Sequence, residues 1–547
     1  MLSAGYRFTL CHTNTLSRPL KLSATKSHLF STSSLVLEKG KKEKDFKDSL
    51  LHPPEPADKW NYNRSPLFDP SSTDYSTFKR VTSNDLAGET TPPREVKMLT
   101  RDFIEDSLYN PHYGYFSKKA TIFDWSDIPF DFGGIRDASE FDAVVARRYA
   151  SYETEKQLWH TPTELFKPWY GQAVAQCLVS EYFLKYFPYE DFIIYEIGAG
   201  NGTLASNILD YLRSEYPEVY DRTRYTIIEI SAKLAQKQRQ RLTKSHPGVS
   251  VVHKSIFHWD VREPAPCFFL SMEVIDNFAH DAIRYDLDTL EPYQGFVTID
   301  KNGDFDMIYT PIDDPLITSF LATRSRLKHP LPFSRLFQQF PSMRKFYRNL
   351  PFAANLSSEE YIPTRLLSLL RTLRNHFPRH RLLLSDFSSL TDTIPGVNSP
   401  VVQTRVHGTT VPCETLLVHQ GSFDIFFPTN FERLRDMYEH ILSQPPKSRS
   451  SSMYADSSIP DRSSPLTSTA LSLSLGSDFF SSHTASGNRR KPKDGVTSAS
   501  GLPIGEHKSS VFTHAEFLGT YGDLGKTRLR NGENPMLDFY KNVKFLL

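Results

Sequence analysis

The sequence has few cysteines, almost no net charge and no long apolar run. Its four cysteines in 547 residues form no CxxC pair, so a structural zinc site is excluded and a reducing compartment fits best. The 64 lysines and arginines balance 63 aspartates and glutamates, so no global field recruits nucleic acid or a membrane surface. No apolar stretch approaches the roughly 20 residues that span a bilayer, so no transmembrane segment is expected.

The N-terminal segment also lacks acidic residues. Residues 1–37 contain no Asp or Glu, whereas they carry Arg7, Arg18 and two lysines among many serines and threonines. This composition is typical of a mitochondrial transit peptide, although a disordered tail shares the same bias. We predict a transit peptide over residues 1–37 and a location in the mitochondrial matrix.

Composition divides the rest of the chain into four parts. Residues 38–91 are charged and proline-rich without periodicity, which predicts a flexible linker. Residues 92–444 carry the main folded domain, with a basic helical insertion near 315–377. Residues 445–510 are rich in serine and proline and are predicted to be disordered. Apolar and glycine-turn patterning returns at 511–547, so this segment is expected to complete the domain.

Strand and helix patterns alternate in the centre of this domain. Strands are expected at "FIIYEIG", "RYTIIEIS", "VSVVHKSI" and "CFFLSMEVID", with amphipathic helices between the first three. Later strands are expected at "YQGFVTID", "FDMIYTP", "HRLLLSDFS" and "TLLVHQGSFDIFF". Two helices are expected upstream, one with an apolar face from Val96 to Leu108 and one that begins near Thr161. The alternation predicts an α/β fold with a parallel, doubly wound, Rossmann-like sheet.

A glycine turn follows the first of these strands. The pattern Glu196-x-Gly198-x-Gly200-x-Gly202 lets the backbone approach a ligand, and the next helix points its N–H groups toward that ligand. The spacing differs from the G-x-G-x-x-G of dinucleotide sites, and the preceding acid disfavours a pyrophosphate. A nucleoside-type ligand such as S-adenosylmethionine fits better, with Glu229 at the end of the second strand bonded to its ribose hydroxyls. A turn that only packs helix on strand is the alternative.

Two more acids follow the strand "CFFLSM". Glu273 and Asp276 fall at the same sheet edge, where carboxylates could hold a guanidinium in bidentate geometry, so they are the candidate catalytic residues. Asp276 or Asn277 could also cap the next helix. His280 is a weaker candidate for a proton acceptor, because a single histidine is more often a packed residue.

Five motifs resemble, in order, those of the MidA-like S-adenosylmethionine-dependent methyltransferases: "SLYNPHYGYF", "TPTELF", "YEIGAGNGTLASNIL", "IIEIS" and "SMEVIDNFAHD". The resemblance covers roughly residues 95–440 and extends into residues 511–530; the first range includes "LLLSDFSSL", which contains Asp386, and "GSFDIFFPTNFERL". It implies a class I methyltransferase sheet with S-adenosyl-L-methionine as cofactor and no metal. The cofactor-binding residues implied are Glu196, Gly198, Gly200, Gly202 and Glu229, and the residues beside the substrate are Glu273 and Asp276.

The animal members of this family act in the assembly of mitochondrial complex I and are described as protein arginine methyltransferases. The resemblance therefore implies a protein substrate, a subunit of complex I. The chain departs from the family pattern at Met272, Asn277 and Ala279, which leaves open a non-catalytic assembly factor that binds a partner through the basic helices near 315–377. A nicotinamide-dependent oxidoreductase is the remaining alternative, and Glu196 disfavours it. A homo-oligomer stays open.

Overall fold

The computed structural model describes residues 75–118, 120–122, 130–150, 157–159, 161–351, 353–406, 409–444 and 508–547. The predicted transit peptide, most of the predicted linker and nearly all of the predicted serine-rich insertion lie outside these residues. From Lys79 onward the described residues form one compact unit. None of its helices has the length and apolar character that a membrane crossing requires. The same residues contain no cluster of three or more histidines, cysteines or acids that would hold a metal ion.

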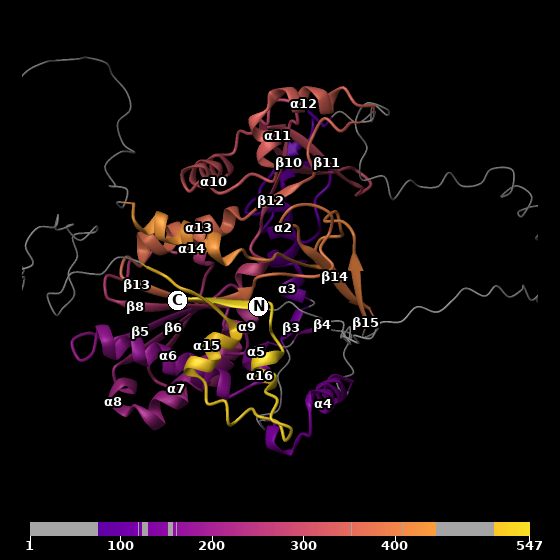
Figure 1. Cartoon of the computed structure of the whole chain (residues 1–547). Helices are drawn as coiled ribbons and strands as arrows, with labels where there is room; N and C mark the ends of the chain where they lie inside the picture. The colour runs from indigo at the N-terminus through magenta and orange to yellow at the C-terminus, as the bar shows by residue number, and fades with distance from the viewer. Residues whose placement is uncertain are drawn as a thin grey trace, which may run out of the picture. The chain divides into compact units, whose positions relative to one another are not determined.

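A seven-stranded sheet forms the centre of this unit (Figure 1). Its strand order is β17-β18-β13-β8-β5-β6-β7. The strands are β5 (Phe192–Ile197), β6 (Thr223–Glu229), β7 (Val249–His253), β8 (Cys267–Met272), β13 (His380–Phe387), β17 (Val511–Thr513) and β18 (Val543–Leu546). The five strands from β13 to β7 are parallel, whereas β18 is antiparallel to both of its neighbours. The edge strand β17 and its neighbour β18 therefore come from the C-terminal segment.

The strand order reverses between β5 and β8. The chain runs from β5 outward to β6 and β7, and then returns to the other side of β5 to form β8. Both strands are buried along their whole length, which agrees with their nearly continuous apolar sequences. The carboxyl ends of strands at such a reversal border a crevice in which α/β proteins bind ligands. The residues that follow Ile197 and Met272 therefore border the expected ligand crevice.

Helices cover both faces of this sheet (Figure 1). The first face carries α6 (Trp169–Lys185), α7 (Thr203–Glu215), α8 (Pro217–Tyr220), α9 (Ala232–Leu242), α15 (His514–Tyr521) and α16 (Pro535–Asp538). The second face carries α10 (Pro315–Arg326), α13 (Thr364–His376), α14 (Phe431–Leu442) and the short helix η2 (Ile256–His258). Each face contributes an apolar cluster, because alternate side chains of β8 and β13 enter opposite clusters.

A second, largely antiparallel sheet packs beside the first (Figure 1). Its strands are β1 (Lys79–Arg80), β2 (Val96–Leu99), β9 (Asp281–Tyr285), β10 (Pro292–Ile299), β11 (Phe305–Pro311) and β12 (Glu360–Ile362), and α2 (Thr100–Tyr109) lies against it. Smaller sheets pair β14 (Val401–Val406) with β15 (Thr409–Cys413) and β16 (Asp424–Phe426), and β3 (Ala120–Ile122) with β4 (Gln157–Trp159). The remaining helices are α3 (Tyr115–Lys118), α4 (Ala138–Ala150), α5 (Pro162–Leu165), α11 (Arg335–Gln339), α12 (Pro341–Arg348), η1 (Phe132–Gly134) and η3 (Ile275–Asn277).

The structure differs from the sequence expectations in four places. Val96 begins strand β2 instead of a helix, because it pairs with Ile299 of β10, and the helix α2 starts only at Thr100. The folded part starts before residue 92, since β1 pairs with β2. The helix expected from Thr161 is two helices, α5 and α6. The strands at 292–311 belong to the second sheet, which the helix-and-strand alternation did not predict.

Candidate functional site

The glycine turn lies at the carboxyl end of β5 and needs its glycines. Gly198, Gly200 and Gly202 have φ values of 65°, 56° and 77°, a region that side chains with a Cβ rarely adopt. A Cβ on Gly198 would also lie 2.9 Å from Cγ2 of Val274. This contact shows that the segment after β8 packs directly on the glycine turn. The two predicted parts of the site are therefore neighbours in space.

Glu164 of the "TPTELF" motif holds the helix that follows the turn. Thr161 is the N-cap of α5, and its hydroxyl accepts a hydrogen bond from the Glu164 backbone N–H at 3.1 Å, which fixes this helix. The buried Glu164 carboxylate accepts hydrogen bonds from the Thr203 hydroxyl at 2.6 Å and the Asn201 amide at 3.2 Å. Lys167 pairs with it at 3.1 Å. This carboxylate stabilises the turn and is not free to bind a ligand.

Glu196 is the penultimate residue of β5, and its side chain points into the protein. Its side chain is 2% exposed, and its Oε2 accepts a hydrogen bond from the Tyr225 hydroxyl at 2.8 Å. Burial raises the pKa of Glu196 to about 7, the Tyr225 hydrogen bond opposes this rise, and the nearby Glu229 adds to it. The carboxyl group therefore changes charge near neutral pH.

Glu229 ends β6 and forms part of a buried polar group beside the turn. Its Oε1 accepts from the Ser231 backbone N–H, and its Oε2 accepts from Gln238 Nε2, both at 2.9 Å. The same Gln238 nitrogen donates to the Gly200 carbonyl at 2.8 Å. The Gln238 Oε1 atom is buried and has no hydrogen-bond partner within the described residues. Gln238 was not predicted from the sequence, where only its position on an amphipathic helix was evident.

The segment from Glu273 to Asn277, which we call the acid loop, follows β8 in an unusual backbone conformation. Glu273 has a φ of 54°, which costs a non-glycine residue of the order of 1–3 kcal/mol. Asp386, at the end of β13, holds the loop in place. Its Oδ2 accepts hydrogen bonds from the backbone N–H groups of Val274, Ile275 and Asp276 at 2.9–3.2 Å. The strain at Glu273 is therefore balanced by a fully buried carboxylate on the neighbouring strand.

The Glu273 side chain is buried and has no hydrogen-bond partner among the described residues. It is 4% exposed, and no described residue donates a hydrogen bond to it. Burial raises the pKa of Glu273 well above its ordinary value, and Asp386 and Asp276 raise it further. Tyr170 of α6 lies within electrostatic reach of this carboxyl group, and its hydroxyl is also buried without a partner. Such orphaned groups indicate a place where a polar ligand would satisfy them.

Asp276 is buried close to α2 and β16, within electrostatic reach of Glu273. Its Oδ1 accepts from the Asn277 backbone N–H at 2.9 Å, and the Asn277 amide donates to Asp424 Oδ1 at 3.0 Å. Tyr109 of α2 donates to the Asn277 carbonyl at 3.1 Å; burial raises the pKa of Tyr109, and Asp276 and Glu229 raise it further. Tyr109 thus lies between the two predicted groups of acids. Tyr109 and Asp424 were not singled out from the sequence, although both occur in stretches with family resemblance.

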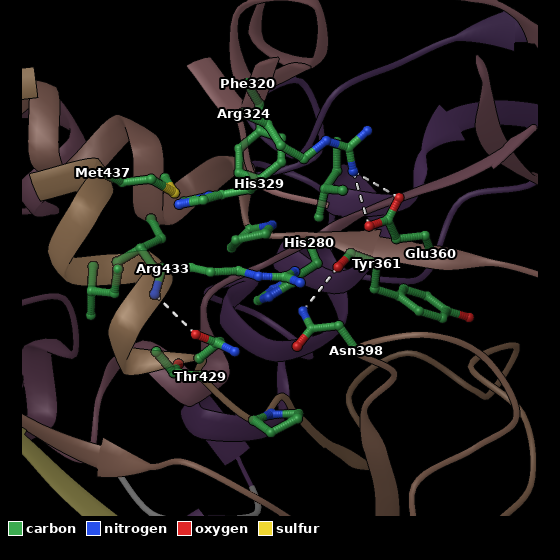
Figure 2. A pocket seen from close by; sticks show the side chains of 16 residues that line it. His280, Phe320, Arg324, His329, Glu360, Tyr361, Asn398, Thr429, Arg433 and Met437 are labelled. Atoms are coloured by element: carbon green, nitrogen blue, oxygen red, sulfur yellow. Dashed lines mark hydrogen bonds and ion pairs between the residues drawn. The ribbon is translucent and has the colours of Figure 1, made fainter. Parts of the chain in front are cut away.

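His280 lies apart from these acids. Its ring stacks on Phe427 with a centroid distance of 3.8 Å, and its Nδ1 lies 2.8 Å from the Phe278 carbonyl oxygen. Burial lowers the pKa of His280 to about 3, so the ring is neutral at physiological pH. It lines a separate cavity with residues of α10, β12 and α14 (Figure 2). Phe427, in turn, donates from its backbone N–H to the Asp276 carbonyl at 2.8 Å.

The arrangement suits a ligand with a nucleoside and a cationic part. Glu229 and the orphaned Gln238 oxygen offer acceptors for hydroxyl groups, and the turn allows close approach of the backbone. Glu196 and Glu273 lie at the carboxyl ends of the neighbouring strands β5 and β8. These residues fit S-adenosylmethionine.

Comparison with known proteins agrees with this geometry. Residues 173–446, half of the chain, match a protein family described as "putative S-adenosyl-L-methionine-dependent methyltransferase". The chain is 25% identical over 339 residues to the mitochondrial protein arginine methyltransferase NDUFAF7 homolog of Schizosaccharomyces pombe, covering 56% of this chain and 67% of the relative. It is 24% identical over 296 residues to the protein of the same name from Saccharomyces cerevisiae, covering 51% and 67%.

Among solved structures, a protein from Burkholderia thailandensis with bound S-adenosyl-homocysteine is similar, with 16% identity, a TM-score of 0.40, and coverage of 66% of this chain and 74% of that one. The family match confirms the fold class and the cofactor predicted from the sequence, and it sets aside the nicotinamide alternative. The chain belongs to the family of S-adenosyl-L-methionine-dependent methyltransferases.

Proposed function

We propose that this protein is a mitochondrial matrix protein arginine N-methyltransferase that acts on a subunit of respiratory complex I during its assembly. The two fungal relatives are named as mitochondrial protein arginine methyltransferases, which supports the acceptor and the compartment. The acid-free segment 1–37 supports import as a transit peptide. The observation that carries the proposal is the buried, unpartnered Glu273 beside the glycine turn.

The glycine turn, Glu196 and Glu229 would hold the cofactor. Bound S-adenosylmethionine supplies a methyl group attached to a positively charged sulfur. Glu229 and Gln238 would accept hydrogen bonds from the two ribose hydroxyls, and the glycines from Gly198 to Gly202 would let the methionine part approach the backbone. No metal is required for the transfer.

Glu273 and Asp276 would bind the substrate guanidinium and orient one terminal nitrogen toward the methyl group. Carboxylates match a guanidinium in bidentate geometry, and a cation in this buried site favours their ionised forms. Glu273 or Asp276 would accept the proton that this nitrogen loses when it takes the methyl group from the bound cofactor, which would leave S-adenosyl-homocysteine as the second product. Proximity and orientation supply most of the acceleration.

The test uses mitochondria from a strain that lacks this protein. Complex I subunits isolated from that strain are incubated with the purified full chain and S-adenosylmethionine carrying a labelled methyl group. We expect methylarginine on one subunit, detected by mass spectrometry, and none with Glu273→Gln. Binding of the cofactor without any methylarginine would overturn the proposal.

The same variant separates the enzyme from a non-catalytic assembly factor. If the Glu273→Gln protein restores complex I assembly in the deletion strain, the contribution of this protein is structural. If assembly fails although the variant folds and binds the cofactor, methyl transfer is the required step.

A further inference from the structure

A second cavity lies behind the acid loop. Its volume is about 60 Å³, and it is enclosed by α10, β12, the start of α13 and the first turns of α14 (Figure 2). One water needs roughly 10–15 Å³ of such volume, so the cavity accommodates a group of about four non-hydrogen atoms. Most of its wall is apolar, and the apolar residues are Phe320, Ile362, Pro363, Leu366, Pro428, Leu434 and Met437.

Most charged groups of this cavity have a counter-ion. Arg324 pairs with Glu360 at 2.9 Å, and His329 lies 3.1 Å from Asp436. These pairs lie at the wall and leave little net charge. A ligand that relied on them would have to break existing hydrogen bonds.

Arg433 is different. Its guanidinium has no hydrogen bond and no ion pair with any described residue, and Figure 2 shows its side chain running across the cavity toward His280 and Asn398. Neighbours on the same helix are paired, since Arg435 bonds to Asp436 at 3.0 Å and Glu432 bonds to Lys544 at 2.6 Å. A partly buried guanidinium between apolar walls is costly without an anion. A carboxylate is the planar oxyanion that matches its donors and the size of the cavity.

One short segment connects this cavity to the acid loop. Asp424 accepts a hydrogen bond from the Asn277 amide, and the Phe427 backbone N–H donates to the Asp276 carbonyl. The next three residues, Pro428, Thr429 and Asn430, line the cavity. Thr429 also donates from its backbone N–H to the Phe387 carbonyl, next to Asp386. The cavity and the acid loop therefore share one wall, the segment from Asp424 to Asn430.

We propose that this cavity binds a carboxylate of the protein substrate, the side chain of an Asp or Glu near the arginine that is methylated. That the carboxylate belongs to the protein substrate rests on the proposed function, whereas the binding of a carboxylate by Arg433 does not. Arg433 supplies the charge and the bidentate donors, and the apolar wall accepts the methylene groups of the acidic side chain. The enzyme would thus select arginines by an acidic neighbour.

The first experiment measures binding without methyl transfer. The full chain is titrated with glutarate, and with glutaramide as the uncharged control, while the melting temperature is recorded. We expect glutarate alone to raise the melting temperature of the unmodified protein and of Arg435→Gln, the matched control on the same helix. Arg433→Gln should lose at least ten-fold in glutarate affinity. An equal response of all three proteins, or no response to glutarate, would overturn the site.

The second experiment identifies the source of the carboxylate. Arginine peptides with a Glu at varied distance, and the same peptides with Gln, are bound to the protein in the presence of S-adenosyl-homocysteine. A preference for the Glu peptides of ten-fold or more that disappears in Arg433→Gln supports the substrate. Glutarate binding without a peptide preference assigns the cavity to a free carboxylate metabolite and overturns the substrate proposal. Because no turnover is needed, these results stand apart from any failure to find methylarginine.

Discussion

The glycine turn and the acid loop lie side by side, yet they are built in different ways. The turn takes its shape from three glycines within five residues and from the helix that follows them. The acid loop takes its shape from Asp386, which accepts a hydrogen bond from the Val274 N–H group 112 residues away, and from Tyr109, whose bond to Asn277 spans 168 residues. The cofactor side is therefore specified locally, whereas the acceptor side depends on tertiary contacts and can diverge with the substrate.

The largest expected effect breaks the acid loop. Asp386→Ala removes the acceptor of four buried backbone N–H groups, including that of Phe387, and should lower the free energy of unfolding by roughly 3–5 kcal/mol. Chemical denaturation measures this loss. Asp260→Ala is the control, because that side chain is 71% exposed and should change stability little. A loss equal to that of the control would show that the loop holds its own shape.

The next effect concerns the turn and its dependence on pH. Burial raises the pKa of Glu196 to about 7 from an ordinary value of 4.5, so the folded state binds its proton more tightly than the unfolded state. The resulting stability is present below pH 4.5 and is lost as the pH rises through 7, a difference of about 3 kcal/mol. When the free energy of unfolding is plotted against pH, the slopes for the unmodified protein and for Glu196→Gln should therefore differ between these pH values. Parallel curves would contradict the prediction.

A third test asks whether the glycine turn and the acid loop have separate functions. Glu273→Gln keeps the size of the side chain but removes the charge that would hold the guanidinium, so kcat should fall by about 100-fold. The affinity for S-adenosylmethionine should stay unchanged, because the glycine turn does not depend on this carboxylate. Steady-state kinetics and calorimetric titration measure the two quantities. A large loss of cofactor affinity would mean that the two sides are one site.

The smallest effect is expected on the cofactor side. Glu229→Gln keeps a polar group of the same size but weakens its hydrogen bonds to the ribose, so cofactor binding should weaken by about 1–2 kcal/mol. Calorimetry with S-adenosyl-homocysteine measures the change, and Glu215→Gln, an exposed residue at the end of α7, is the control. An unchanged affinity would move the ribose site away from β6.

These differences explain what could be predicted from the sequence. The strands around Glu196 and Glu229 and the turn glycines were predictable, because apolar runs and glycine spacing report local structure. The partners of Glu273 and Asp276 were not, since Asp386, Asp424 and Tyr109 reach the loop only after the chain has folded. Nor could periodicity divide strands between two sheets: β10 and β11 have the same apolar alternation in either place.

The place of β18 inside the sheet has a consequence for biosynthesis. This strand lies between β13 and β17, and it pairs Leu546 with both Leu384 and Val511. During translation β13 therefore remains an open sheet edge until residues 388–542 have been added, and such edges recruit other unpaired strands. A protein imported into an organelle in extended form would meet the same interval after entry. Chaperone binding to the stretch His380–Phe387 is the protection that this topology calls for.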